Sequence, residues 1–148
     1  MLGNLATTYE KIGRLDEGLR LLRDVYSGQL KLSGEEDSST LKAASNFASS
    51  LVDLRRFEEA RSVLRKSVPV ARRSLGENDL ITLTLRTHYA KALYEDASAT
   101  LDDLRAAVTT LEDSARISKR VLGGKHPLTI AIEHNLEMAR KALSARSV

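Results

Sequence analysis

The chain has 148 residues, of which 42% are hydrophobic and 29% charged, so its length and composition suit about one ordinary soluble domain. Only 4% of the residues are aromatic, two are proline and none is cysteine, which disfavours a β-sandwich and excludes disulfides, thiolate zinc sites and cysteine nucleophiles. The net charge of +3 comes from 23 basic and 20 acidic residues that are interspersed, without the clustered basic face of a nucleic-acid-binding protein.

The sequence repeats itself at a spacing of 42 residues. Asn4-Leu5-Ala6 recurs as Asn46-Phe47-Ala48, and His88-Tyr89-Ala90 follows at the same spacing. The next interval is 47 residues, because Asn135 follows His88 by that number, which places five extra residues near 96–100. This insert is expected to be a tolerated lengthening of a loop or to make a specific contact. We predict a single array with repeats at about 1–36, 37–78 and 79–125 and a terminal helix at 126–146.

Each repeat is predicted to contain two helices, because its apolar residues recur at steps of three and four rather than in alternation. In chain order, the predicted helices cover about residues 2–12, 15–32, 39–54, 57–75, 80–95, 101–122 and 127–145. The fold class is therefore all-α, with about seven helices. Small residues at Ala6, Ala48, Ala60, Ala90 and Ala107 are expected where the two helices of a repeat approach closely.

The predicted helix ends have local causes. Gly13 is expected to take a positive φ and end the first helix, and the later helices are expected to end at Gly34, Gly76 and Gly123. Asp79 is a predicted N-cap, and Thr100 with Asp103 resembles a capping box. Pro127 suits a first helical turn, whereas Pro69 is expected to kink the helix 57–75 or to interrupt its hydrogen bonds.

One such helix pair cannot bury its apolar face alone, but stacked pairs can. Stacking predicts a right-handed superhelix of antiparallel pairs with a concave side, an α-solenoid. A spacing of 42 residues also fits HEAT or armadillo repeats, so the spacing by itself leaves the type of repeat open.

The residues within the repeats resemble the tetratricopeptide repeat in its 42-residue form, which is the form found in kinesin light chains. The matching residues are Asn-Leu-Ala-x-x-Tyr at 4–9, Gly-Arg-Leu-x-Glu at 13–17, Arg-Phe-Glu-Glu-Ala at 56–60 and Leu-Gly-Gly-Lys-His-Pro-Leu-Thr at 122–129. The resemblance extends over nearly the whole chain. It implies a scaffold whose first helices line a concave groove that holds a peptide or a protein segment.

The resemblance places the family's groove asparagine at Asn4, Asn46, His88 and Asn135. Helical spacing adds Thr7, Lys11, Lys42, Ser45, Ser49, Asp53, Thr84, Thr87, Lys91 and Glu95 to the same face. An asparagine both donates and accepts hydrogen bonds, so it can hold a peptide backbone. The alternative is structural, in which these asparagines bond the backbone of the next repeat. The Lys/Asn/Lys/Arg set by which one subclass binds a C-terminal carboxylate does not fit in either register.

The leading hypothesis is thus a cytoplasmic protein-interaction scaffold, and the alternative is a structural fragment of a longer array or a self-associating module. Met1 aligns with Ala43, in the middle of a predicted helix, so the first helix lacks about one turn and is expected to promote dimerisation or marginal solubility.

We expect no enzyme, no cofactor, no metal site and no nucleic-acid or membrane partner. The phosphate-loop and GxSxG motifs are absent, and His126 and His134 are too far apart for a helical metal pair. No apolar run approaches the ~20 residues of a membrane span.

Overall fold

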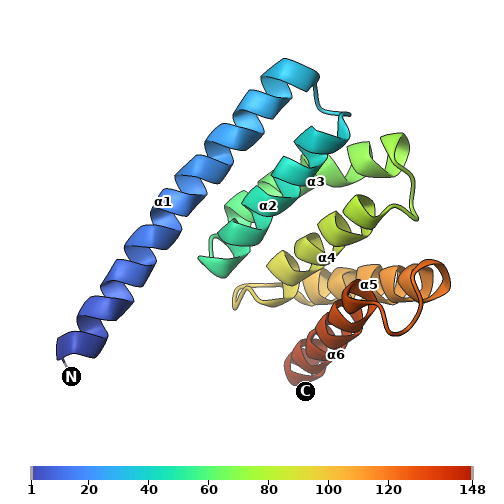
Figure 1. The fold of residues 1–148 in the computed structure, drawn as a ribbon. Helices are drawn as coiled ribbons and strands as arrows, with labels where there is room; N and C mark the ends of the chain where they lie inside the picture. The colour runs from blue at the N-terminus through green and yellow to red at the C-terminus, as the bar shows by residue number, and fades with distance from the viewer. Residues whose placement is uncertain (1, 148) are drawn as a thin grey trace.

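The computed structural model describes the backbone of residues 2–147 and the side chains of Lys11 and of residues 13–147. All regular secondary structure in this part of the chain is helical. The helices are α1 (Leu2–Ser33), α2 (Ser38–Asp53), α3 (Phe57–Ser74), α4 (Leu80–Tyr94), α5 (Leu101–Val121) and α6 (Pro127–Ser147) (Figure 1). The last five agree with the predicted helices to within two residues, which confirms the all-α repeat fold. The division of the chain into four repeat units stays a prediction.

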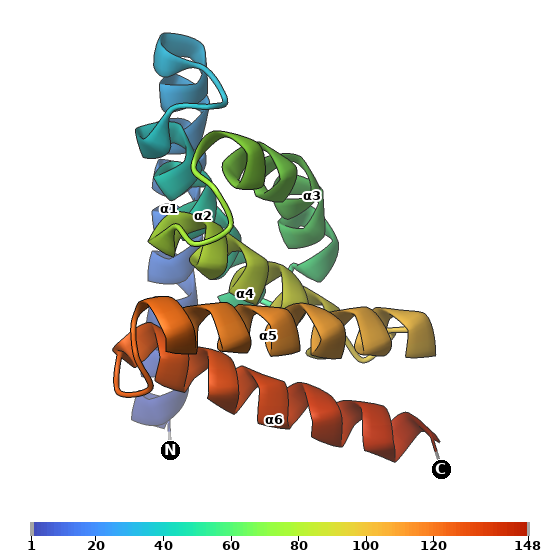
Figure 2. The same cartoon turned by 90° about the vertical axis from the view of Figure 1, so that its right-hand side faces the viewer.

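The helices form two layers. Each helix packs against the next one along the chain, and α4 also packs against both α2 and α6, so that α2, α4 and α6 form a continuous layer (Figures 1 and 2). Helices α3 and α5 lie outside this layer and make no contact with each other. Side chains of α2 and α4 therefore line a surface that the outer helices leave uncovered.

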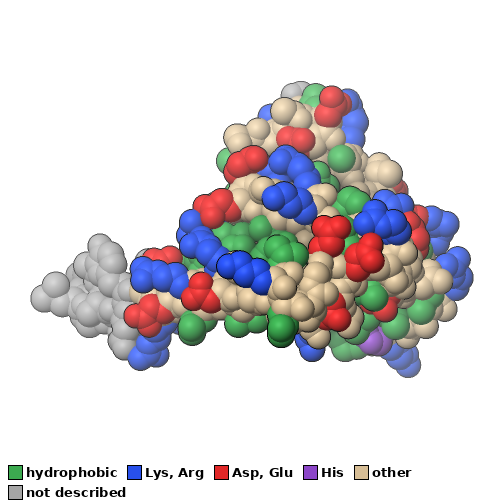
Figure 3. Space-filling model, turned by 90° about the horizontal axis from the view of Figure 1, so that it is seen from above, with side chains coloured by type: hydrophobic (Ala, Val, Ile, Leu, Met, Phe, Trp, Pro, Cys, Tyr) green, Lys and Arg blue, Asp and Glu red, His purple; other side chains and the backbone are tan. Residues whose placement is uncertain are grey.

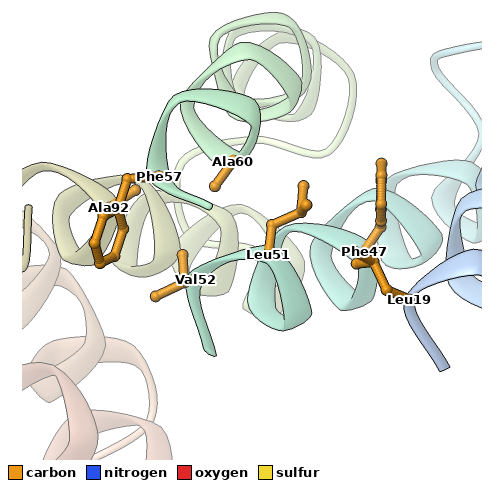
Figure 4. Close-up of a cluster of buried hydrophobic side chains, with 7 residues drawn as sticks. All are labelled: Leu19, Phe47, Leu51, Val52, Phe57, Ala60 and Ala92. Atoms are coloured by element: carbon orange, nitrogen blue, oxygen red, sulfur yellow. The ribbon is translucent and has the colours of Figure 1, made fainter. Parts of the chain in front are cut away.

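A buried cluster holds the first four helices together. It consists of Leu19, Phe47, Leu51, Val52, Phe57, Ala60 and Ala92, which come from α1, α2, α3 and α4 (Figure 4). Within the described part of the chain, the small residues Ala48, Ala60, Ala90 and Ala107 are fully buried. A larger side chain at these positions would push the paired helices apart, because protein interiors are close-packed.

The helix ends follow the local sequence. Asp79 accepts a hydrogen bond from the Ile81 N–H at 2.8 Å, and Thr100 and Asp103 form a capping box, as predicted. Gly34, Gly76 and Gly123 have φ values of 84°, 94° and 90°, which only glycine adopts without strain. Sequence reasoning missed Asp37, which caps α2 through the Ser39 N–H at 2.9 Å.

A threonine near the start of each inner helix fixes that helix to the preceding one. Thr40 donates to the Gln29 carbonyl oxygen at 3.2 Å, and Thr82 donates to the Ala71 carbonyl oxygen at 3.3 Å. The third such threonine is Thr129 of α6, whose hydroxyl accepts a hydrogen bond from Ser118 of α5 at 3.0 Å. Because all three threonines are buried, each bond satisfies a hydroxyl that would otherwise be costly to bury.

The prediction of two helices at residues 2–12 and 15–32 was wrong. Residues Leu2–Ser33 form one continuous helix, and Gly13 has no positive φ. A single glycine in a helix costs only about 1 kcal/mol relative to alanine, and the residues after it, Arg14 to Glu17, include good helix formers. The glycine therefore permits a turn without imposing one.

Pro69 lies in the interior of α3, as the sequence predicts. Helix α3 continues through it from Phe57 to Ser74, so the proline does not end the helix. Proline lacks the N–H that would bond four residues back, but the flanking hydrogen bonds and the packed face of α3 maintain the helix. Val70 and Ala71, directly after the proline, are buried in the core.

Candidate binding groove

Helices α2 and α4 run in the same direction (Figure 1). Residues in the first halves of both helices line a hollow. The hollow has a volume of about 320 Å³ and is lined by Lys42, Ser45, Asn46, Leu80, Ile81 and Thr84. Four of these six residues are on the predicted groove face. Sequence reasoning missed Leu80 and Ile81, although helical spacing places them one turn before Thr84. Leu80 is 49% exposed, so the hollow offers apolar surface to a ligand.

Polar groups surround this apolar surface. The side chains of Lys42 and Asn46 are exposed, and Thr84 is half-buried with its hydroxyl bonded to the Leu80 carbonyl oxygen at 2.8 Å. Lys42 brings a positive charge, and the Asn46 amide can donate and accept at once. The hollow thus combines an apolar floor with a cation and a bifunctional amide.

The opposite ends of α2 and α4 carry charged and titratable groups. The pKa of His88 is lowered from 6.5 to about 4, mainly by burial and also by the charge of Lys91, while the charge of Asp53 opposes both. His88 is therefore neutral at pH 7. Lys91 lies 3.9 Å from the Glu95 carboxylate, and Arg55 donates to the Glu95 carbonyl oxygen at 3.4 Å.

Three of the predicted groove residues are largely buried. Ser45 is buried although it lines the hollow, and Thr87 is buried with its hydroxyl bonded to the Leu83 carbonyl oxygen at 2.7 Å. Asn135 is 9% exposed; its amide oxygen accepts from the Tyr94 hydroxyl at 2.5 Å and its amide nitrogen donates to the Ala131 carbonyl oxygen at 2.8 Å. Asn135 is thus bonded to a side chain of α4 and to the backbone of its own helix, and not to the backbone of a next repeat.

The remaining predicted residues are not part of the hollow. Ser49 is half-buried and Asp53 is exposed, both on the last turns of α2, while Lys11 is exposed on α1. The side chains of Asn4 and Thr7 lie outside the described residues. The groove residues that the structure brings together are therefore those of α2 and α4.

Sequence reasoning also missed a buried arginine. Arg86 on α4 lies 2.9 Å from the Asp113 carboxylate on α5 and 3.8 Å from that of Glu77, which in turn pairs with Arg72 at 2.6 Å. Burial raises the pKa of Asp113, but the hydrogen bonds and charges of Arg86 and Arg116 outweigh it and hold that pKa below its usual value. The network connects α3, α4 and α5. Its sequence signal was an arginine at helical steps of three and four from the apolar residues Leu83 and Ala90.

Two further features of the described residues concern metal binding and membrane spans. Among them, no three His, Asp or Glu side chains are grouped so that they could hold a metal ion. No helix in the same part of the chain combines the length and apolar character that crossing a membrane requires.

The stacked helix pairs and the recurring Asn, Ala and Thr positions define a helical-repeat protein. Residues 40–80 match the family model of the tetratricopeptide repeat, so this part of the chain is similar to one repeat of that family. Such domains are in general protein-interaction modules, and their fold is typically non-catalytic. No curated protein sequence matches this chain.

Two solved structures share its architecture. The first is a crystal structure of nearly identical TPR-like repeats assigned to a kinesin light chain of Podosopora anserina, which is 25% identical with a TM-score of 0.78. The match covers 95% of this chain and 64% of that one, so this chain spans just under two-thirds of its length. The second is a variant of the same repeats, 22% identical with a TM-score of 0.52, in a match that covers 97% of this chain and 85% of that chain.

Proposed function

We propose that the chain is a scaffold that binds a segment of a partner protein along α2 and α4. The segment lies extended over the hollow, and one of its apolar side chains inserts against Leu80 and Ile81. The observation that carries this proposal is the hollow itself, in which Lys42, Asn46 and Thr84 surround exposed apolar surface.

The volume of the hollow suits such a segment. About 320 Å³ is at the lower end of the range for small-molecule pockets, and this hollow is open to solvent along one side. A shallow pocket of this size accommodates a side chain of a docked segment more readily than it encloses a whole ligand. Affinity would then come from several such contacts along the helices.

The polar groups would orient the segment. The Asn46 amide can pair with both the N–H and the C=O of an extended backbone, which gives affinity that depends little on the ligand's sequence. Lys42 favours a carboxylate beside the inserted side chain. Because Lys42 is exposed to solvent, its charge contributes more to the association rate and specificity than to affinity.

A peptide selected from a random display library against the full chain would test this proposal. Its affinity is measured by fluorescence anisotropy for the wild type and for Asn46→Ala, Leu80→Ser and Lys42→Ala. We expect Asn46→Ala and Leu80→Ser each to weaken binding about tenfold, equivalent to about 1.4 kcal/mol, and Lys42→Ala to weaken binding less and mainly at low salt.

The matched control is Lys119→Ala, which removes an exposed lysine from the outer helix α5. It should leave the affinity unchanged, and circular dichroism should show that every variant keeps its helices. Unchanged affinity in both Asn46→Ala and Leu80→Ser would rule out the groove.

A second candidate function, self-association, is favoured by a separate observation on α1. The second half of this helix presents exposed apolar side chains, including Leu21 and Leu32.

A further inference from the structure

The second half of α1 has two apolar faces, and only one of them is covered. Leu19, Leu22 and Tyr26 pack against the cluster formed with α2. The other face, here called the open strip, consists of Gly18, Leu21, Val25, Gly28 and Leu32, at helical steps of three and four. Leu21, Val25 and Leu32 are 66%, 52% and 82% exposed, so an apolar stripe several turns long faces solvent.

The same strip is covered in the other repeats. A shift of 42 residues carries the open strip onto Ala60, Val63, Ser67, Val70 and Ser74 of α3, and a further 47 onto Ala107, Thr110, Ser114, Ile117 and Val121 of α5. Ala60, Ser67 and Val70 are buried, as are Ala107, Ser114 and Ile117, whereas Ser74 and Val121 at the last position are exposed. The strip from Gly18 to Gly28 therefore corresponds to an interface that the two later repeats form.

What covers it in the second repeat is that repeat's own first helix. Ala60 shares a buried cluster with Phe47 and Leu51 of α2, and Val70 shares another with Leu41 of α2. By the same correspondence, the open strip of α1 should receive the first helix of its own repeat, which is the segment 2–13.

The sequence of this segment fits that role. Its apolar positions are Leu2, Leu5, Ala6, Tyr9 and Ile12, which correspond to Ala44, Phe47, Ala48, Leu51 and Leu54 of α2 and its C-cap. However, the segment continues α1 in a straight line, in a helix about 48 Å long at 1.5 Å per residue (Figure 1). Two halves of one straight helix cannot pack against each other. In Figure 3, the coloured part of α1 at the left carries hydrophobic side chains along one edge.

We propose that two copies of this chain exchange residues 2–13, so that the first half of each α1 covers the open strip of the other from Gly18 to Val25. Such a reciprocal exchange is two-fold symmetric and rebuilds between chains the contacts that a helix pair makes within one chain. It also extends the inner layer of α2, α4 and α6 by one more helix on each copy.

Symmetry and charge both suit a second copy. Each copy contributes both a strip and a segment, so the exchange forms two equivalent contacts. Antiparallel pairing about Gly13 brings Lys11 of one copy close to Asp16 of the other, and both side chains are exposed in the single chain. The opposite charges therefore favour this register.

Gly13 is the hinge of the exchange. It corresponds to Arg55, which has a φ of 60° in the turn between α2 and α3. Glycine adopts both that conformation and the helical one, so residues 2–13 could instead fold back within a single chain. Gly13→Ala disfavours the turn and favours the straight helix, so it should increase the fraction of exchanged dimer.

Crosslinking distinguishes the exchanged dimer from a monomer in which residues 2–13 fold back. Cysteines can be placed at chosen positions because the chain has none of its own. Tyr9→Cys and Gly18→Cys are made in separate, differently tagged chains, which are unfolded, mixed, refolded and treated with a short bismaleimide. The equivalent residues Leu51 and Ala60 share one cluster, and a side chain at Gly18 meets no atom within 4 Å. Exchange predicts an interchain crosslink, which the control pair Tyr9→Cys and Ser144→Cys should not give.

The complementary experiment uses a double variant that carries both Tyr9→Cys and Gly18→Cys in one chain. Intrachain crosslinking of that variant, with no interchain product from the mixture, would overturn the proposal in favour of a closed monomer. Failure of both reactions, or a dimer that does not crosslink at these positions, would overturn it as well.

Mass measured by light scattering gives a second test. Wild type should be a dimer, Val25→Lys on the open strip should be a monomer, and Ser27→Lys on the solvent-facing side of α1 should remain a dimer. Circular dichroism checks that both variants keep their helices. A monomeric wild type at high concentration, or equal masses for the two variants, would contradict the exchange.

Discussion

Asp96, in the loop before α5, accepts a hydrogen bond from Arg61 of α3 at 2.9 Å, and both side chains are mostly buried. Arg61 also donates to the Ala92 carbonyl oxygen at 3.0 Å and to Glu58 at 2.7 Å. Of the two roles expected for the five-residue insert, the structure therefore favours a specific contact over a simple lengthening of the loop. The contact between Asp96 and Arg61 joins the loop before α5 to the preceding outer helix, α3.

Asp96→Ala should lower the free energy of unfolding by about 2 kcal/mol, because it leaves a mostly buried guanidinium without its buried partner. Urea denaturation measures the change. Glu58→Gln is the control: Glu58 pairs with the same arginine but is 73% exposed, so its loss should cost clearly less than the loss of Asp96. Equal costs for the two variants would show that the loop contact is not specific.

Tyr94→Phe should lower the free energy of unfolding by about 1–2 kcal/mol. The substitution removes the hydroxyl that donates to Asn135 and leaves a buried amide oxygen unpaired. Tyr89→Phe removes the hydroxyl of a half-buried tyrosine that makes no hydrogen bond within the described protein, and should cost little. The midpoints of thermal unfolding compare the stabilities of the two variants. A larger loss for Tyr89→Phe would refute the stabilising role of the bond between Tyr94 and Asn135.

Acid should destabilise the fold through His88. Its pKa is about 4 in the folded protein and 6.5 as its ordinary value, so the unfolded chain binds the proton more tightly. The stability from neutral His88 is fully present above pH 6.5 and is lost as the pH falls towards 4, up to about 3 kcal/mol.

Urea midpoints measured between pH 7 and pH 4.5 check this prediction. His88→Gln should flatten the curve, because glutamine does not titrate. His134→Gln, at an exposed histidine on α6, should leave the slope as in the wild type. If His88→Gln keeps the wild-type slope, the imidazole is not the titrating group.

Asp113→Ala should be among the most destabilising single substitutions, at about 3 kcal/mol or more. It leaves Arg86 buried on α4 with only the Glu77 carboxylate nearby, at 3.8 Å. Glu77→Ala, at the more distant and more exposed partner, should cost clearly less. Denaturant titration measures the loss in free energy of unfolding for both variants. A larger loss for Glu77→Ala than for Asp113→Ala would refute the proposal that Asp113 is the main partner of Arg86.

The repeat spacing was sufficient to predict the five helices after α1, because their caps are local and their apolar faces follow a fixed period. It could not predict the course of α1, since Gly13 permits both a turn and a helix at similar cost and only tertiary contacts decide between them.

The groove was predicted only in part, for a related reason. Helical spacing assigns residues to a face but not to a neighbour. It therefore placed Lys42 and Thr84 on one surface but missed the bond between Asn135 and Tyr94, which are 41 positions apart.

The proposal that a partner segment binds along α2 and α4 is tested most directly by mapping where a bound peptide lies. Amide chemical shifts of the labelled full chain are followed during titration with a peptide selected against it. The proposed groove predicts that the largest shifts fall on α2 and α4 around Asn46, Leu80 and Thr84. Shifts concentrated instead on the outer helices α3 and α5 would contradict binding in the groove.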